Sequence, residues 1–310
     1  MSNVNKQLLI CPLYAALPQN LQYKAFFPTP PGCRKIILAT NIAETSVTVP
    51  GVRFVIDTGL QKRRKFNPQL GIETLQIHPI SKSSAAQRAG RAGREAPGTC
   101  FRLYPSRHFA ELEENSTPEI RECDLTSLVL TLKIHGHDDI LNFPFLDRPK
   151  RESVVRSLET LYLLGALGTD GKPTELGKQM NLLPLTPELA KVLLSSTMGE
   201  VNCAAEVIDI IACMSASSAS SNAIFLQPSA EKREENLENR KHFASTWGDH
   251  ITLLQAFREY QTVAKAGSQG GVKEWCQRWG ISRRVMKNVL VSLWFSMLIS
   301  GNPKATVWVL

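Results

Sequence analysis

A short stretch rich in arginine and glycine, SSAAQRAGRAGREAPG at residues 83–98, holds the side chains best suited to chemistry. On a helix, with about 100° between successive residues, Gln87, Arg91 and Arg94 fall within roughly 60° of one another. Arg88 points away from that face and is a candidate for an ion pair with an acidic neighbour. Because only alanine and glycine separate these residues, we expect a helix from Gln87 to Arg94 whose backbone can approach a neighbouring domain closely.

The chemistry that this face suits is the binding of a triphosphate. Arginine forks bind phosphate oxygens through parallel hydrogen bonds, and a glutamine can orient an attacking water. Each glycine lowers helix stability by about 1 kcal/mol relative to alanine, so glycines here indicate a packing or functional reason. The alternative is a solvated helix rich in arginine, but such a helix would tolerate lysine, glutamate and larger spacers.

The charge of the chain is concentrated in one region. The 310 residues carry a formal net charge of +8, and residues 60–107 hold ten basic side chains against Glu73 and Glu95, so the remainder nets to zero. A basic block of this kind indicates a polyanionic partner: nucleic acid, nucleotide phosphates, or both. For the run QKRRK alone, a solvated charged face is the alternative.

Composition argues against several other classes of protein. An apolar share of 43% fits a soluble globular protein. The longest apolar run, VLVSLWFSMLIS at 289–300, has 12 residues, which is too short to span a bilayer and predicts a buried helix. We find no signal peptide at the start of the chain. Seven single cysteines without a C-x-x-C pair indicate a reducing compartment and argue against a zinc cluster.

The order of the apolar segments predicts an α/β region followed by helices. RKIILAT at 34–40 and GVRFVIDTG at 51–59 are nearly continuous apolar runs, typical of strands in a sheet covered on both faces. Thr40 and Asn41 stand at the end of the first run, and ligands bind just past the carboxyl ends of such strands. From Thr117 onward the pattern is mainly helical, and it includes a tight turn and a capped helix typical of a winged helix.

These segments together resemble the C-terminal part of the DEAH-box RNA helicases of superfamily 2. ATNIAETSVTVPGVRFVIDTG followed by ISKSSAAQRAGRAGR resembles the family's motifs V and VI, and LYAALPQNLQYKAF resembles the segment before motif V. The segment from TPEIRECDL to LETLYLLGAL is similar to its winged helix. GDHITLLQAFREY and EWCQRWGISRR are similar to its ratchet domain. The resemblance covers roughly residues 11–292.

The resemblance implies a division of the chain into domains. A partial second RecA-like domain with a parallel sheet would occupy residues 1–112, and a winged helix 113–186. A mainly α-helical ratchet domain would follow at 187–300, then an atypical tail at 301–310 in place of the family's OB-fold.

The resemblance also implies a role for each matching residue. Gln87, Arg91 and Arg94 would be catalytic and face the γ-phosphate, with the two arginines as finger residues. Ser46 and Thr48 would lie near the nucleotide, although a local helix cap is the alternative for Ser46. Contacts to RNA would come from the strand end, where capping is the alternative, and from a β-hairpin at 62–77: Thr40, Asn41, Lys62, Arg63, Arg64 and Lys65.

Several features of the family are missing from this sequence. Pro50 stands where many members have an acidic residue, so an implied nucleotide contact does not extend to that position. We find no G-x-x-x-x-G-K-[ST] loop, no Asp-Glu-x-His box and no Ser-Ala-Thr motif. ATP and Mg²⁺ are implied, but the Mg²⁺ ligands would lie on an absent N-terminal domain, and we expect no metal site on this chain. Both ends look cut, so we expect a fragment or a partial gene model.

Two functions of different classes follow from these observations. One is an enzyme: the C-terminal half of an ATP-dependent RNA helicase that couples hydrolysis to 3′-to-5′ movement on RNA or to ribonucleoprotein remodelling. The other is a non-catalytic module that binds RNA or an adaptor, which we favour for the isolated chain because the phosphate cradle is missing. The expected partners are RNA and a glycine-rich adaptor at the winged helix, with no membrane and a monomeric state.

Three segments favour one branch of the family. EVIDIIACMSA, LQPSAEKREENLENR and WCQRWGISRRVMKNV are most similar to the branch that processes pre-ribosomal RNA, and the spliceosomal branch is the alternative. Ribosome biogenesis would place the protein in the nucleus or nucleolus.

Overall fold

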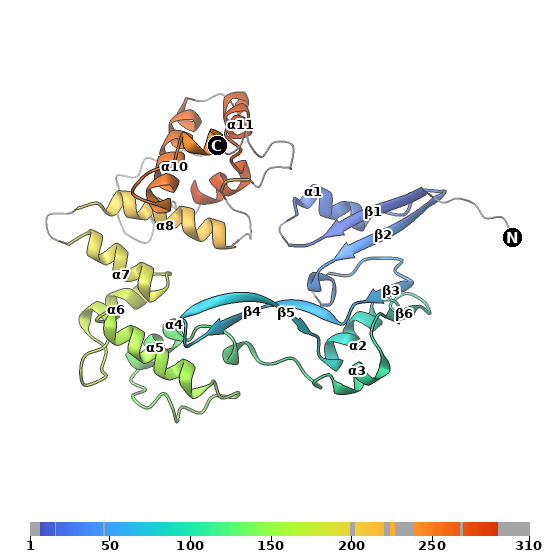
Figure 1. Cartoon of the computed structure of the whole chain (residues 1–310), viewed down its shortest axis with the longest axis horizontal. Helices are drawn as coiled ribbons and strands as arrows, with labels where there is room; N and C mark the ends of the chain where they lie inside the picture. The colour runs from blue at the N-terminus through green and yellow to red at the C-terminus, as the bar shows by residue number, and fades with distance from the viewer. Residues whose placement is uncertain are drawn as a thin grey trace. The chain divides into compact units, whose positions relative to one another are not determined.

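Two compact units make up the chain, Met1–Pro187 and Glu188–Leu310 (Figure 1). The computed structural model describes residues 7–15, 17–45, 47–198, 202–219, 224–226, 238–266 and 269–290. Three expectations lie wholly or largely outside the described residues: the placement of Ser46, the buried helix beyond Leu290, and the tail at 301–310.

A parallel pair of strands opens the first unit. β1 (Gln7–Leu13) pairs with β2 (Cys33–Ala39), and α1 (Gln19–Gln22) with the 3-10 turn η1 (Tyr23–Ala25) lies in the connection between them. Alternate residues of a strand face opposite sides. One side forms a small core with η1, centred on Cys11, Leu13 and Ala25.

A second parallel pair joins distant segments. β3 (Phe54–Asp57) pairs with β6 (Thr99–Arg102), and the β-hairpin and α2 lie between them in sequence. Parallel strands followed by helices confirm the predicted α/β class.

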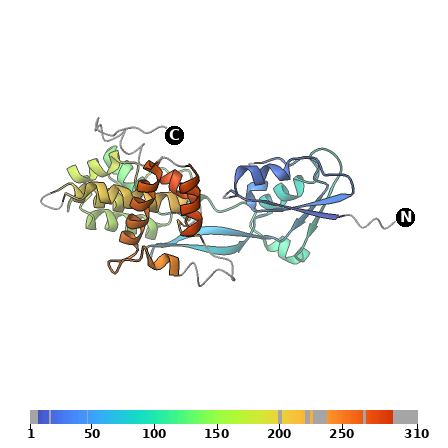
Figure 2. The same cartoon turned by 90° about the horizontal axis from the view of Figure 1, so that it is seen from above.

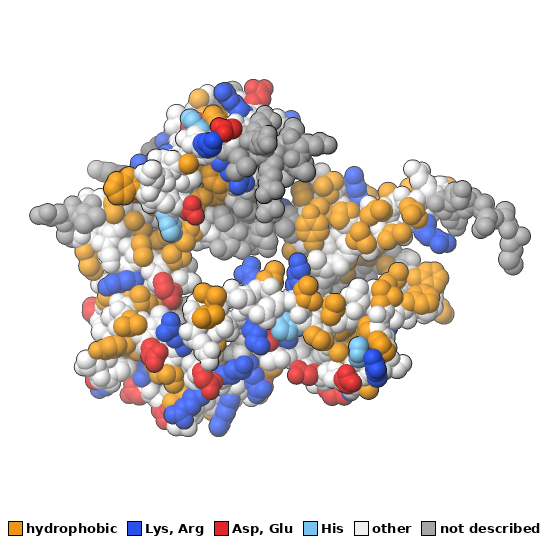
Figure 3. Space-filling model, in the orientation of Figure 1, with side chains coloured by type: hydrophobic (Ala, Val, Ile, Leu, Met, Phe, Trp, Pro, Cys, Tyr) orange, Lys and Arg blue, Asp and Glu red, His pale blue; other side chains and the backbone are white. Residues whose placement is uncertain are grey.

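The expectation that the sheet is covered on both faces is wrong for the described residues. The side chains of one face of each strand pair are exposed, and Figure 3 shows apolar side chains gathered over this part of the molecule. In the pair β1 and β2, the core forms on the other face, where η1 packs. The continuous apolar runs therefore contain more apolar side chains than the described residues bury. The exposed side chains include Leu8, Ile10, Ile36, Leu38, Phe54, Ile56 and Phe101.

The predicted hairpin is confirmed. β4 (Leu60–Asn67) and β5 (Ile72–Pro79) are antiparallel and form a long ribbon (Figure 2). The Asn67 side-chain oxygen accepts hydrogen bonds from the backbone of Gln69 at 3.0 Å and Leu70 at 3.3 Å. Gly71 closes the turn with φ of +67°, a conformation that favours glycine.

Helices lie between and after the two strands of the second pair. α2 (Lys82–Gly90) precedes β6, and α3 (Ser106–Glu111) and the 3-10 turn η3 (Glu119–Arg121) follow it. The predicted start at Thr117 therefore gives only the short turn η3. α4 (Thr126–Ile134) is the first longer helix after it.

The winged-helix region follows the predicted pattern. α5 (Arg151–Leu163) agrees with the mainly helical pattern expected after Thr117, and a bridge between Leu167 and Pro173 closes the tight turn. Thr174 then caps α6 (Glu175–Leu182), because its hydroxyl accepts a hydrogen bond from the backbone of Gly177 at 3.0 Å.

The second unit is helical in its described part. Its elements are α7 (Pro187–Ser196), α8 (Ala204–Ala219), α10 (Asp249–Lys265) and α11 (Gln269–Arg278), and residues 283–290 are also helical. Its core gathers side chains from α8, α10, α11 and the helix at 283–290, together with Phe243 and Ile281 from the connecting segments.

Candidate functional site

Helix α2 presents the glutamine and arginines, but it ends earlier than predicted. Its first turn is capped by Ser81, whose hydroxyl accepts a hydrogen bond from the backbone of Ser84 at 3.1 Å. The helix ends at Gly90, and the backbone of Arg91 donates to the carbonyl of Arg88 at 3.1 Å, a tighter i to i+3 pattern. The expected helix up to Arg94 is therefore wrong, since the glycines lower the stability of a further turn.

Arg88 lies in a network of ion pairs on the inner side of α2. Its Nε donates to Glu44 Oε1 at 2.8 Å, and its Nη1 donates to Asp57 Oδ1 at 2.8 Å. Its Nη2 also donates to the carbonyl of Leu60 at 3.1 Å. The side chains of Arg88, Glu44 and Asp57 are 15%, 14% and 0% exposed. The prediction that Arg88 points away and pairs with an acidic neighbour is confirmed.

Asp57 is the fixed end of this network. Besides Arg88, it accepts hydrogen bonds from the backbone of Gly59 at 2.9 Å and from the Tyr104 hydroxyl at 2.8 Å. Burial, together with the hydrogen bond to Asp57, raises the pKa of Tyr104 to about 12. For Arg88, burial lowers the pKa, but the hydrogen bonds to Asp57 and Glu44 outweigh it, so the net shift is upward.

Arg91 is in the opposite situation. Its Nε and Nη1 are shielded from solvent and have no hydrogen-bond partner among the described residues. Desolvation lowers the pKa of its guanidinium, the nearby charge of Arg94 lowers it further, and Glu44 partly opposes both. A buried charged donor without an acceptor is costly, so the site favours an anion that would accept these hydrogen bonds.

Arg94 has left the helix and contacts the segment of motif V. Its Nη1 donates to the Thr48 hydroxyl, so the structure brings together two of the predicted nucleotide-binding residues. The Glu95 carboxylate accepts a hydrogen bond from the backbone of Gly51 at 3.0 Å, which ties the same two segments. The guanidinium of Arg94 is exposed on this surface.

The spacers around the arginines have different surroundings. A Cβ on Gly98 would lie 2.2 Å from the Ala92 carbonyl oxygen and 2.6 Å from that of Arg53, so only glycine fits there. A Cβ on Gly90 or Gly93 would meet nothing within 4 Å. Contacts within the described residues therefore do not explain these two glycines, and the approach of a neighbouring domain stays a prediction.

Gln87, Thr40 and Asn41 present exposed side chains. Gln87 lies on α2 one turn before Arg91. Thr40 is the N-cap residue of the 3-10 turn η2 (Asn41–Ala43), but its side chain makes no capping hydrogen bond. The alternative to RNA contact was that Thr40 caps the end of the strand. The structure shows no such capping hydrogen bond from its hydroxyl.

The four basic residues of the hairpin fall on two faces. Lys62 lies opposite Ile77 and Arg64 opposite Leu75, on one exposed face. Arg63 faces the other way. Its guanidinium pairs with Glu122 at 2.8 Å and also donates to the carbonyl of Thr117 at 3.0 Å.

The site residues that sequence reasoning missed are Glu44, Asp57 and Tyr104. Only one signal pointed to them, the orientation of Arg88 away from the predicted face. Their partners lie 31 to 47 residues away in the chain, and no local pattern encodes such contacts.

Comparisons with known proteins now bear on this geometry. Three family models match in order: the helicase conserved C-terminal domain at residues 2–96, the winged-helix helicase-associated domain (HA2) at 157–185, and the ratchet-like HA2 domain at 186–253. Pre-mRNA-splicing factor ATP-dependent RNA helicase DEAH10 of Arabidopsis thaliana is 44% identical over 292 residues, 91% of this chain and 40% of that protein. Probable ATP-dependent RNA helicase DHR2 of Saccharomyces cerevisiae is 44% identical over 284 residues, 90% of this chain and 38% of that protein.

The chain belongs to the DEAH-box RNA helicases. It spans about two fifths of the length of these curated relatives. In this helicase chain, the Arg91 and Arg94 region lies within the matched C-terminal helicase domain, and α6 lies within the matched winged helix.

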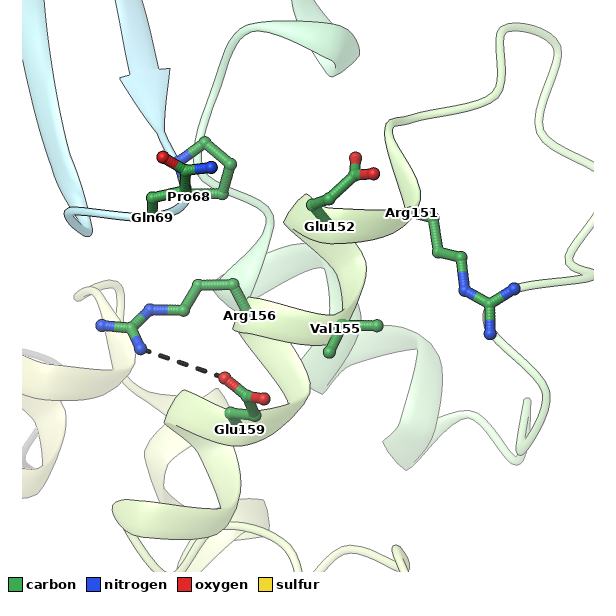
Figure 4. Close-up of a pocket in the computed structure, with 7 residues that line it drawn as sticks. All are labelled: Pro68, Gln69, Arg151, Glu152, Val155, Arg156 and Glu159. Atoms are coloured by element: carbon green, nitrogen blue, oxygen red, sulfur yellow. Dashed lines mark ion pairs between the residues drawn. The ribbon is translucent and has the colours of Figure 1, made fainter.

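A cavity of about 460 Å³ lies where the helicase hairpin meets the winged helix (Figure 4). It is separate from the arginine site. The hairpin turn contributes two residues and α5 the rest: Pro68, Gln69, Arg151, Glu152, Val155, Arg156 and Glu159. A Cβ on Gly71 would lie 3.2 Å from Arg156 Nη2, so this arginine also contacts the hairpin turn.

The described residues lack two features, a cluster of metal-ligating side chains and a membrane-spanning helix. They contain no group of three or more histidine, cysteine, aspartate or glutamate side chains that could hold a metal ion. None of the described helices has the length and apolarity needed to cross a membrane.

Proposed function

We propose that the first unit binds the terminal phosphates of ATP through Arg91 and Arg94 and serves as the arginine-finger side of an RNA helicase. The observation that carries this proposal is the pair of shielded Arg91 nitrogens for which the described residues supply no acceptor. A second cation nearby, Arg94, lowers the pKa of Arg91, and a phosphate chain would relieve both the desolvation and the repulsion.

Each residue has a separate part in the reaction. Arg91 and Arg94 stabilise charge that develops on the transferred phosphoryl group. Thr48 orients Arg94 through its hydrogen bond. Gln87 is exposed one helical turn from Arg91, in a position to orient the attacking water. In the family pattern Ser46 would join this group, and it lies outside the described residues.

The test is an ATPase assay on the chain completed with the unmatched portion of the yeast relative. Arg91→Ala and Arg94→Ala should each lower kcat by about 10³–10⁵, the usual value of an arginine finger. Arg107→Ala, which removes an exposed arginine of the same unit, should change the rate less than about twofold. A folded Arg91→Ala protein that keeps turnover within about tenfold of the parent would contradict the proposal.

The RNA-binding part of the proposal rests on the strand end and the hairpin. Thr40 and Asn41 expose hydrogen-bonding groups, and Lys62 and Arg64 expose cations on one face of the ribbon. Arg63 and Lys65 lie on the other face and would contribute less. Movement of these elements during ATP hydrolysis would drive the strand in the 3′-to-5′ direction or remodel a ribonucleoprotein.

For the isolated chain, we propose a non-catalytic role in binding RNA or an adaptor. The sequence has no phosphate-cradling loop of the G-x-x-x-x-G-K-[ST] type. Purified residues 1–310 should therefore show no RNA-stimulated ATPase above a buffer blank. Turnover that Arg91→Ala abolishes would contradict this role.

We also propose a glycine-rich adaptor at the winged helix. Exposed apolar side chains on α5 and α6 support it, since Leu163 and Leu182 are 80% and 78% exposed. Leu163→Glu should abolish capture of a glycine-rich adaptor peptide without lowering thermal stability. Analytical ultracentrifugation should find the chain monomeric.

The pathway that we propose is pre-ribosomal RNA processing, in the nucleus or nucleolus. Three sequence segments support this branch, although one relative is named as a pre-mRNA-splicing factor. Sequencing of RNA crosslinked to the protein in cells decides between them. Enrichment of intron-containing transcripts over pre-ribosomal RNA would favour splicing.

A further inference from the structure

Glu44 is an acidic side chain whose charge acts on Arg91. Its carboxylate opposes the downward shift in the Arg91 pKa that desolvation and Arg94 produce. No hydrogen bond joins the Arg91 Nε or Nη1 to any described acceptor. The charge of Glu44 thus acts on the Arg91 guanidinium, while the two Arg91 nitrogens have no hydrogen-bond partner among the described residues.

The reason is that the Glu44 carboxylate is already occupied. Its Oε2 accepts a hydrogen bond from the Ser84 hydroxyl at 2.8 Å. Its Oε1 lies 2.8 Å from Arg88 Nε and 2.7 Å from Arg88 Nη2. Both oxygens therefore point at the inner side of α2.

Arg88 is itself held in place from the far side. Its Nη1 donates to Asp57 at 2.8 Å, and its Nη2 reaches the carbonyl of Leu60 at 3.1 Å. The Asp57 carboxylate is fixed in turn by the Tyr104 hydroxyl and the backbone of Gly59. Because the Asp57 side chain is fully buried, this anchor has little freedom to move.

We propose that Arg88 is a positioning residue that sequesters Glu44 and so keeps Arg91 free for phosphate. This inference rests on the proposed phosphate site. Without Arg88, the Glu44 carboxylate would be left partly buried with one missing partner, and the guanidinium of Arg91 is the nearby cation that could replace it. An internal pair between Glu44 and Arg91 would then compete with the phosphate.

The experiment follows the Arg91 Nε–H signal by nuclear magnetic resonance during titration of the 310-residue chain with inorganic tripolyphosphate. Arg91→Lys identifies the signal. In the wild type the signal should shift and saturate. In Arg88→Gln it should be displaced before any ligand is added, and the affinity should fall by about tenfold or more, because the internal charge-assisted pair must break first.

Removal of the competitor is the decisive step. Arg88→Gln combined with Glu44→Gln should restore the affinity to within about threefold of the wild type, because no carboxylate remains to pair with Arg91. A purely structural role for Arg88 predicts that the double variant binds as weakly as the single one, or more weakly. Arg258→Gln, which removes an ion pair with Glu206 in the second unit, is the matched control.

Each outcome decides something. If the wild-type signal does not move with tripolyphosphate, the phosphate site is wrong and this inference falls with it. If the wild type responds and Arg88→Gln binds equally well, or the double variant is not rescued, only the sequestering role is wrong. If Arg88→Gln does not fold, Glu44→Gln alone decides: we expect equal or tighter binding, and a loss of affinity would overturn the inference.

Discussion

Replacement of Arg88 by alanine tests the network on the inner side of α2 as a source of stability. The change removes contacts to Glu44 and Asp57 and leaves a fully buried carboxylate. Breaking a buried ion pair from one side costs about 3–5 kcal/mol. Asp57 keeps two other donors, Tyr104 and the backbone of Gly59, and Arg88 is 15% exposed, so we expect the lower part of that range, about 3–4 kcal/mol. For a unit of this size the loss corresponds to roughly 5–15 °C in melting temperature.

The distribution of tryptophan makes the assay specific. All five tryptophans belong to the second unit, at positions Trp247, Trp275, Trp279, Trp294 and Trp308. Tryptophan fluorescence therefore reports on unfolding of the second unit, whereas far-ultraviolet circular dichroism reports on both. In Arg88→Ala, part of the dichroism transition should move to lower temperature while the fluorescence transition stays in place.

The matched control is Arg64→Ala, in the same unit. Arg64 is 62% exposed and lies 4.0 Å from Glu73, and exposed pairs contribute about 0–1 kcal/mol. Its melting curves should overlay those of the wild type. A dichroism shift in Arg88→Ala no larger than in Arg64→Ala would refute the assignment of stability to this network.

Three further predictions concern the room for a Cβ at two glycines, the pH dependence of stability and the salt dependence of RNA binding. Gly98→Ala should destabilise the chain, whereas Gly90→Ala should stabilise it by roughly 0.5–1 kcal/mol in urea unfolding, because only the first lacks room for a Cβ. The pKa of Tyr104 rises to about 12 on folding, so its protonated form stabilises the fold below about pH 10 and that stability is lost as the pH rises towards 12. Tyr104→Phe should reduce this loss of stability at alkaline pH. If the free energy of unfolding falls as steeply with pH in Tyr104→Phe as in the wild type, Tyr104 is not its source. Arg64→Gln should reduce the salt dependence of RNA binding by about one unit of slope, while Arg63→Gln should leave it nearly unchanged, as measured by fluorescence anisotropy.

Local signals predicted the elements well where one residue decides the backbone. The hairpin turn follows from Asn67, whose side chain bonds the next residues, and from Gly71 with its positive φ. The cap of α6 by Thr174 is equally local. The helix containing Gln87 was also predicted, but its end was misplaced, because periodicity alone does not show where glycines stop a helix.

Contacts between distant segments could not be predicted in the same way. The apolar runs of β2 and β3 indicated a sheet covered on both faces, and in the described residues one face is exposed. A run of apolar residues shows that a face is suited to burial, but it does not show which segment covers it. The partners of Arg88 depend likewise on how α2, β3 and the segment around Glu44 meet in space.

Pairing, rather than net charge, separates the arginines that hold the first unit together from those that are available to a ligand. Arg63 and Arg88 belong to the same basic block as Arg64 and Arg91, and the net charge counts all four equally. Arg63 and Arg88 are mostly buried and pair with carboxylates within 2.8 Å, so neither can bind a phosphate without breaking an internal contact. Arg64 is exposed with only a distant acidic neighbour, and two nitrogens of Arg91 have no acceptor at all among the described residues. The positive charge that a polyanion meets is therefore smaller than the block suggests, and it includes the hairpin face and the end of α2.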